Sequence, residues 1–455
     1  DSGEVSGIRF GVQNESARLN LAVLPIWELK KKGSGRAALL GLPGMTQSVA
    51  DAILDWVDAD DKDRQFVRES SYYSGLGVPY GPRNAEPSSL EELLLVRGVT
   101  RDLLFGRDAN LNYRLDASEE QTTLTDFTSA GSAGSLPWSS LLTVYSAEKN
   151  LGPKGNPKID LNEKSLTKLE AELSKVFDRN QARFIILYRQ YGPYKGKEAT
   201  RSRSKAIAKT DMTIPGKYRF TTVLDVIGAK VRIPIKADKS TSSGNSASSD
   251  SASSDSTASD KKKSKKPKPS PKTPTHQVID SPFTASQGSM RRYMAQLVGS
   301  ATVDREKVLR GRINLNRAPQ SVLEAVPGMD KGLAGQISGG RSSQGFRGAQ
   351  SRQLPTWPLT EGLVNLEKMK ELLPYVTVGG DVYRAQVVGF FDDGGPFARA
   401  EIVVDATVDP PRQVYYKDLR LLGRGYSLQT LGAEESGTSL SSSLQDNELF
   451  EAAPE

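Results

Sequence analysis

A sequence typical of two helices joined by a tight turn occurs twice in this 455-residue chain. This repeat limits the possible folds more than any other feature. Residues 39–53 (LLGLPGMTQSVADAI) and 323–337 (LEAVPGMDKGLAGQI) share identical residues at fixed offsets. The matched pairs are Leu39 and Leu323, Pro43 and Pro327, Gly44 and Gly328, Ala50 and Ala334, and Ile53 and Ile337. Identities at constant spacing indicate an internal repeat.

Each copy predicts a helical hairpin. Apolar residues on one helical face precede a Pro-Gly turn, whose glycine accepts a positive φ, and an Ala and an Ile three positions apart begin a second amphipathic helix. A third, divergent copy starts at Lys158 with the entry sequence KIDLN and continues with the spacing of Leu166, Leu169 and Leu173. In this copy Phe177-Asp178 replaces Pro-Gly.

Changes in composition divide the chain into domains. Alternating residues at the start, and three β-rich runs between residues 375 and 426, predict strands, whereas the Ser-, Lys- and Pro-rich segment 237–275 has too few apolar side chains to form a core. We expect a β-domain at 1–21 and 375–430, a helical repeat with an acidic loop at 22–150, a divergent repeat at 151–236, a disordered linker at 237–275, a third repeat at 276–374 and a flexible tail at 431–455.

Composition excludes several kinds of site. The chain has no cysteine, which rules out thiol catalysis, disulfides and thiolate metal sites, and its one histidine, His276, lies beside the linker, which argues against a Ser-His-Asp triad. The net charge is +7, but residues 236–275 contribute +5, so no basic folded surface is implied. No apolar run reaches the roughly 18 residues of a membrane span.

An acidic run follows the first repeat and has two interpretations. Asp58, Asp60 and Glu69 stand at positions one, three and twelve of an EF-hand register, but Lys62 at position five and Asp63 at position six exclude a true EF-hand. Oxygen-rich side chains at this density are consistent with an irregular calcium site. A solvated acidic loop is the commoner structure for such a run, and the sequence leaves both open.

Three phrases in order resemble a known family. They are RLNL from Arg18, LPGMTQSVADAILDWVDADD from Leu42, and SLEELLLVRGVT from Ser89, and together they resemble the minor pseudopilin K family of type II secretion systems, also called general secretion pathway protein K. The similarity is strongest over residues 7–105 and weaker over residues 312–378 and the final strands.

The resemblance implies an α+β fold. A small antiparallel sheet formed by the two chain ends would carry a large helical insertion, and an N-terminal membrane helix would precede Asp1. Such a protein is not an enzyme. It caps the tip of a periplasmic pseudopilus with other minor pseudopilins, primes pseudopilus assembly, and contacts secreted cargo or the outer-membrane channel, after anchoring in the inner membrane.

The resemblance also implies Ca2+ in the helical domain, with the matching acidic segment here supplied by Asp58, Asp60, Asp61 and Glu69.

Two other classes of function remain as alternatives. The Pro-Gly hairpins are compatible with a nucleic-acid-binding helix-hairpin-helix protein, although Thr46 and Asp330 stand where such turns have a second glycine. A metal-dependent hydrolase using Asp and Glu is the other, and no motif in the chain supports it.

Overall fold

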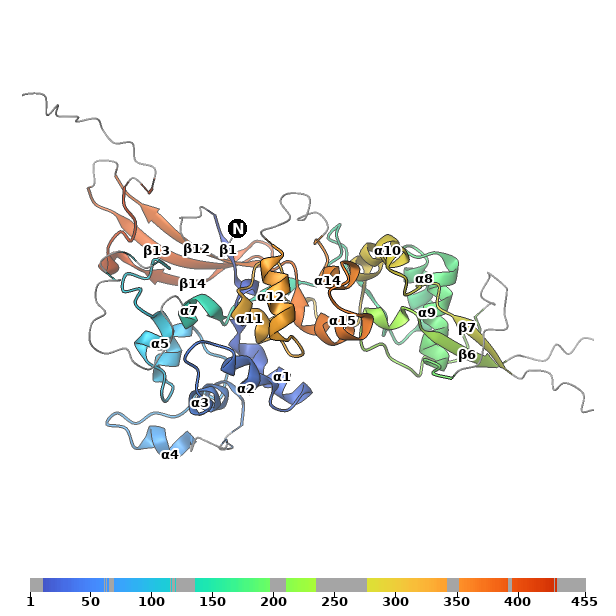
Figure 1. Cartoon of the computed structure of the whole chain (residues 1–455), viewed down its shortest axis with the longest axis horizontal. Coiled ribbons are helices and arrows are strands. Elements are labelled where there is room, and N and C mark those ends of the chain that lie inside the picture. Colours follow the sequence, from blue (N-terminus) through green and yellow to red (C-terminus); the bar gives the residue numbers. More distant parts are fainter. Residues whose placement is uncertain are drawn as a thin grey trace, which may run out of the picture. The chain divides into compact units, whose positions relative to one another are not determined.

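The computed structural model describes residues 11–60, 62, 64, 69–114, 116, 119, 136–196, 210–234, 276–341, 352–391, 395–428, 430 and 431. They form two compact units, one from residues 1–150 with 306–455 and the other from residues 151–305. Both units mix helices with strands, which confirms the α+β class (Figure 1). The predicted linker at 237–275 and residues 432–455 of the predicted tail lie outside the described residues.

A four-stranded antiparallel sheet lies in the first unit, in the strand order β1-β12-β13-β14. The strands are β1 (Gln13–Asn14), β12 (Val382–Gly389), β13 (Ala398–Asp405) and β14 (Arg412–Asp418) (Figure 1). Gln13 lies opposite Arg384 and Asn14 lies opposite Tyr383. Segments from the beginning and the end of the chain therefore share one sheet.

The strand expected over residues 8–21 is interrupted. Residues 8–10 lie outside the described part, and 3-10 turns η1 (Glu15–Ala17) and η2 (Leu21–Val23) follow two-residue strands. The cause is local, because the side chains of Asn14 and Asn20 accept hydrogen bonds from the backbone N–H groups of Ser16 and Ala22 and start the turns. Within the described part of this segment, which begins at Gly11, only Gln13 and Asn14 pair with the large sheet.

Helices of the first unit surround a core that includes Leu39, Ile53, Leu323 and Ile337, each with no exposed surface. The first repeat contains α1 (Leu24–Lys30), α2 (Ser34–Leu40), α3 (Gln47–Val57), α4 (Glu69–Ser74), η3 (Leu90–Leu95), α5 (Arg101–Phe105) and α7 (Trp138–Leu141). The third contains α11 (Gln320–Glu324), α12 (Lys331–Gly339), α14 (Trp357–Thr360), α15 (Leu366–Leu372) and η6 (Leu373–Tyr375). Strands β4 (Ala147–Lys149) and β9 (Val308–Arg310) pair antiparallel, and η7 (Arg420–Leu422) follows β14.

The second unit has its own core, with Leu169, Phe184, Ile185 and Phe283 fully buried. Tyr188 stacks on Phe220 with ring centroids 4.3 Å apart. Its elements are β5 (Ile159–Asp160), α8 (Leu166–Leu173), α9 (Arg179–Tyr191), η4 (Val223–Val226), the antiparallel pair β6 (Lys230–Pro234) and β7 (His276–Asp280), α10 (Gln287–Ser300) and β8 (Ala301–Thr302).

Three short parallel strand pairs mark the repeats. The entry strand of each repeat pairs with a two-residue exit strand: β2 (Leu19–Asn20) with β3 (Leu142–Thr143), β5 with β8, and β10 (Ile313–Asn314) with β11 (Val376–Thr377). The second repeat thus extends to Thr302, and the predicted boundaries at residues 236 and 276 require correction. Residues 276–305 belong to the second unit because α10 packs there, with Tyr293 edge-on to Phe283 at 5.3 Å.

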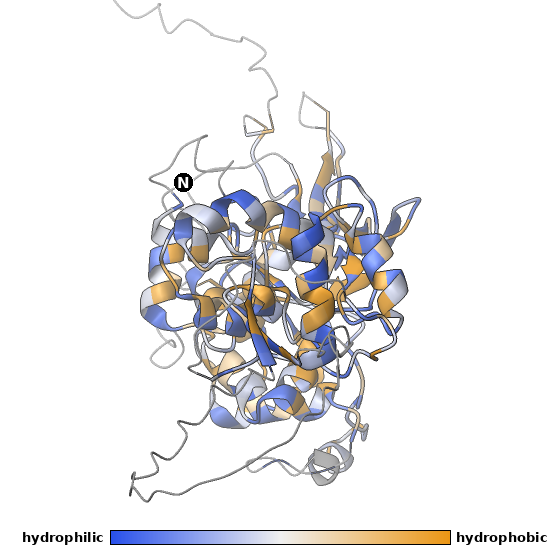
Figure 2. Ribbon diagram, turned by 90° about the vertical axis from the view of Figure 1, so that its right-hand side faces the viewer, coloured by the Kyte–Doolittle hydropathy of each residue, from blue (hydrophilic) through white to orange (hydrophobic). Residues whose placement is uncertain are grey.

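The predicted helical hairpins are present as α2–α3 and α11–α12, and the divergent copy forms α8–α9. In each, the residue before the second helix caps it: Thr46, Asp178 and Asp330 accept N–H groups from the first turn. The helices carry both hydrophobic and hydrophilic residues, as expected of amphipathic helices that pack on a core (Figure 2). None of the helices in the described ranges is both long enough and apolar enough to cross a bilayer.

Candidate functional site

An ionic network joins the two chain ends on the inner face of the large sheet. Arg384 of β12 donates from Nε to Glu15 Oε1 at 2.8 Å and also pairs with Glu401 of β13. Arg18 Nη1 lies 3.3 Å from Glu15 Oε1. Burial alone would raise the pKa of Glu15, but the charges of Arg18 and Arg384 outweigh it and lower that pKa below its ordinary value. The carboxylate is thus held ionised inside the protein.

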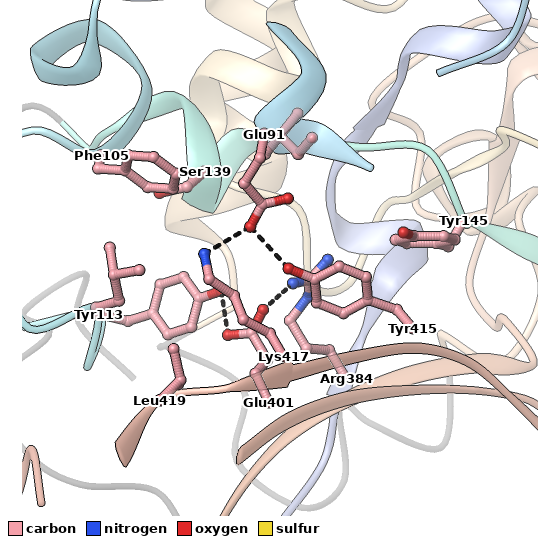
Figure 3. A pocket seen from close by; sticks show the side chains of 12 residues that line it. Glu91, Phe105, Tyr113, Ser139, Tyr145, Arg384, Glu401, Tyr415, Lys417 and Leu419 are labelled. Atoms are coloured by element: carbon pink, nitrogen blue, oxygen red, sulfur yellow. Dashed lines mark hydrogen bonds and ion pairs between the residues drawn. The ribbon is translucent and has the colours of Figure 1, made fainter. Parts of the chain in front are cut away.

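A second polar cluster connects the sheet to the helical part. Lys417 Nζ and Tyr415 Oη of β14 each donate to Glu91 Oε1 of η3 at 2.7 Å (Figure 3). Burial opposes ionisation of Glu91, but the hydrogen bonds from Lys417 and Tyr415 prevail and lower its pKa to about 2. This carboxylate therefore ties the first helical repeat to the sheet.

Both clusters line one pocket between the sheet and the helical repeat. Tyr113 donates to Glu401 Oε2 at 2.7 Å across this space (Figure 3). The lining residues are Leu90, Glu91, Phe105, Leu111, Tyr113, Ser139, Tyr145, Arg384, Glu401, Tyr415, Lys417 and Leu419. Each charged group that lines it is hydrogen-bonded to another side chain of the lining or to Glu15, so the arrangement suits a structural joint.

The sequence analysis did not find these residues. A signal was present, because Arg384 and Gln386 alternate with apolar residues along β12, and Arg399 and Glu401 do so along β13. Alternation places such residues on one face of a strand. It did not show that this polar face is the buried one, which depends on the helical repeat that covers it.

The opposite face of the sheet is apolar. Cross-strand neighbours Ala385, Ile402 and Tyr416 lie in one row, and Val387 lies opposite Ala400. Val387 is 52% exposed and Tyr416 is 58% exposed. The outer face of the sheet therefore has an apolar part with large side chains open to solvent, and the exposed Asp418 lies beside it, opposite Ala400.

The four residues expected to bind calcium are not all described. Asp58, just after α3, pairs with Arg64 at 2.6 Å, and Asp60 accepts the N–H of Lys62 at 3.0 Å. Asp61 lies outside the described residues, and Glu69 begins α4 with its side chain outside the description. Within the described ranges, no three Asp, Glu or His side chains come together as a metal site on their own.

Asp55, which the sequence analysis did not single out, contributes to the same place. Its side chain is 1% exposed, and its Oδ1 lies 2.7 Å from Arg64 Nε. Burial raises the pKa of Asp55 to about 7, and the charge of Arg64 only partly opposes this. The Arg64 guanidinium thus contacts the carboxylates of both Asp55 and Asp58 but does not balance the negative charge of both. Additional positive charge would therefore be favourable here.

The hairpin turns offer little to a nucleic acid. In each turn the capping oxygen takes an N–H group at the start of the second helix, as Asp330 does for Leu333 at 2.9 Å. A phosphate would need the same N–H groups, and the Asp330 carboxylate would repel it. The turns serve to pack and cap helices.

Comparison with known proteins agrees with the sequence resemblance. Residues 17–105 match the model of a family described as type II secretion system (T2SS), protein K. Type II secretion system protein K of Pectobacterium carotovorum subsp. carotovorum is 30% identical over 100 residues, which are 22% of this chain and 29% of that relative. The match therefore spans less than a third of the relative's length.

A solved structure is also similar over much of the chain. It is the crystal structure of the GspK-GspI-GspJ complex from the enterotoxigenic Escherichia coli type 2 secretion system. The match covers 90% of this chain and 78% of that chain, with 10% sequence identity and a TM-score of 0.36.

Proposed function

We propose that this chain, which belongs through residues 17–105 to the protein K family of type II secretion systems, is a minor pseudopilin that caps the tip of a pseudopilus and primes its assembly. It acts by assembly and performs no catalysis. It works in the periplasm and is anchored in the inner membrane before assembly.

One observation carries the proposal: β1 pairs with β12, so the helical repeats are inserted between two strands of one sheet. The ionic network of Glu15, Arg384 and Glu401 and the contacts of Glu91 with β14 attach the first repeat to that sheet. A large helical body on one face of a small sheet would hinder the addition of a further subunit over that face. That property suits a cap.

The apolar outer face supports a contact with other minor pseudopilins. It combines exposed Val387 and Tyr416 with the row of Ala385 and Ile402, whereas the inner face is already covered by the first helical repeat. Burial of apolar area contributes about 25 cal/mol per Å2, so a contact here would stabilise a complex. Secreted cargo or the outer-membrane channel would contact the helical part.

We also propose that Ca2+ binds at the acidic segment through Asp58, Asp60, Asp61 and Glu69. The under-compensated carboxylates of Asp55 and Asp58 support this site, since carboxylate oxygens are suitable Ca2+ ligands. Arg64 holds Asp58, so binding there requires that this guanidinium move. Bound Ca2+ would supply positive charge and order the loop.

The proposal is tested by copurification of the tagged chain, with its membrane segment, with the other two minor pseudopilins of the same secretion system. The wild type should retain both, and Ile402→Glu should lose them, because it places a charge in the apolar row. Gln47→Glu, at an exposed polar position at the start of helix α3 and away from this face, is the matched control and should retain both. Equal retention by Ile402→Glu, with circular dichroism unchanged, would contradict contact through this face.

A further inference from the structure

A second stretch of the chain has the register of a calcium-binding loop. Between residues 108 and 119, side chains with oxygen atoms stand at positions one, three, five, nine and twelve. They are Asp108, Asn110, Asn112, Asp116 and Glu119. This is the order of ligands in a twelve-residue EF-hand loop, including the Glu at position twelve that binds through both oxygens.

The one departure from that pattern is position six, where Tyr113 replaces the usual glycine. Glycine serves there because the chain must bend sharply through a conformation that other residues avoid. Tyr113 adopts this conformation, with φ of +61°. The loop therefore makes the required bend despite the substitution.

Hydrogen bonds connect the residues of this register to one another. Asn110 Nδ2 and Asn112 Nδ2 both donate to Asp116 Oδ2, at 2.8 and 3.0 Å. Glu119 reaches back across the loop, where Oε1 accepts the N–H of Ala109 at 2.9 Å. These contacts link the start, the middle and the end of the register.

Burial supplies a separate indication that this loop would accept a cation. Asp108 is 5% exposed and Glu119 is 9% exposed, so both carboxylates are more than nine-tenths buried. In the described part of the chain, no Lys or Arg forms an ion pair with Asp108, Asp116 or Glu119. Buried carboxylates in proteins are generally paired with a cation or bound to a metal, whereas these accept hydrogen bonds from backbone and asparagine N–H groups.

We infer that the loop of residues 108–119 binds one Ca2+, at a site distinct from the acidic segment after α3. Asp108, Asn110 and Asn112 would supply one oxygen each, the backbone carbonyl of Arg114 another, and Glu119 two. Asp116 would bind through water. This set favours Ca2+ over Mg2+, because a bidentate Glu and about seven ligands exceed the six that Mg2+ accepts.

The loop also connects the helical repeat to the sheet. The carbonyl of Leu111 accepts hydrogen bonds from Gln386 at 2.6 Å and from Arg399 at 2.8 Å, and Asn112 donates to the carbonyl of Gly425 at 2.7 Å. Tyr113 donates to Glu401. Calcium in this loop would fix the backbone that makes these contacts, so it would stabilise the joint on which the proposed cap depends.

Isothermal titration of Ca2+ into the purified, chelator-treated full chain tests this inference. The Ca2+ binding that remains in Asp58→Ala should weaken at least about tenfold when Glu119→Gln is added, because the bidentate carboxylate is lost. Asp102→Asn, which removes an exposed carboxylate from the neighbouring helix α5, is the matched control and should leave binding unchanged. Equal binding by Asp58→Ala with and without Glu119→Gln would overturn the inference, as would an absence of Ca2+ binding in Asp58→Ala.

A gain-of-affinity variant guards against misfolding as an explanation. Asn110→Asp adds a negatively charged ligand at position three and should tighten Ca2+ binding severalfold, an effect that a damaged fold does not produce. Unchanged or weaker binding by Asn110→Asp would count against the site. These measurements need no secretion partner, so their outcome is independent of the pseudopilin assignment.

Discussion

Arg384 donates a hydrogen bond to Glu15 across 2.8 Å, although 369 positions of the chain separate the two residues. Both side chains are almost completely buried, and Arg384 also pairs with Glu401 on the adjacent strand. Arg384 also lies opposite Gln13 in the pairing of β1 with β12. The strand pair and the ion pair therefore hold the same two segments together.

Replacing Arg384 with Met should therefore destabilise the first unit strongly. The substitution leaves the buried carboxylates of Glu15 and Glu401 without their shared cation, a loss of about 3–5 kcal/mol in the free energy of unfolding. Urea unfolding measures it. Arg310→Met removes an exposed pair with Glu86 and should cost at most about 1 kcal/mol. Similar losses for the two variants would show that the buried network contributes no more than a surface pair.

Glu91 should make stability depend on pH below about 5. Its pKa of about 2 in the folded chain lies below the roughly 4.3 of an unfolded Glu, so its contribution is complete above pH 5 and is lost as the pH falls towards 2. The stability difference between wild type and Glu91→Gln should accordingly shrink over this range, measured by thermal unfolding at each pH. Glu367→Gln, at an exposed carboxylate, is the control, with a difference within about 0.5 kcal/mol throughout. A constant difference for Glu91→Gln would refute the pH dependence.

Ca2+ at the acidic segment should raise the melting temperature, and a chelator should lower it, because a ligand that binds only the folded state stabilises it. Asp58→Ala should reduce the rise. Arg64→Ala should increase it, since removal of the guanidinium leaves Asp55 and Asp58 for the metal to compensate. A rise that is the same in wild type, Asp58→Ala and Arg64→Ala would place Ca2+ binding elsewhere in the chain.

Local sequence patterns predicted much of this fold. The Pro-Gly hairpins and the alternation along the last three strands depend on neighbouring residues, and these elements are present. The end of the second repeat was placed wrongly, because α10 and β8 follow a long low-complexity segment. Only in three dimensions does β8, Ala301–Thr302, pair with Ile159–Asp160. Sequence proximity is a poor guide to such contacts.

The candidate sites divide in the same way. Glu15, Glu91 and Arg384 show no short-range signal of their pairing, since each partner lies on a distant segment. The register from Asp108 to Glu119 is a local pattern that the sequence itself carries, whereas the calcium expectation at Asp58 came from the family resemblance.

Gly311 tests how tightly the first and third repeats pack within the first unit. Its φ is +68°, and a Cβ atom there would lie 2.4 Å from Cγ1 of Val23, so Gly311→Ala combines backbone strain with a steric clash. We expect a loss of about 2–4 kcal/mol in the free energy of unfolding, measured in urea. Gly33→Ala is the matched control, because Gly33 has φ of +85° but nothing within 4 Å of the added Cβ, so only the backbone cost of about 1 kcal/mol remains. Equal losses for the two variants would mean that Val23 and Gly311 can separate without cost, and the two repeats would then be joined less closely than this contact indicates.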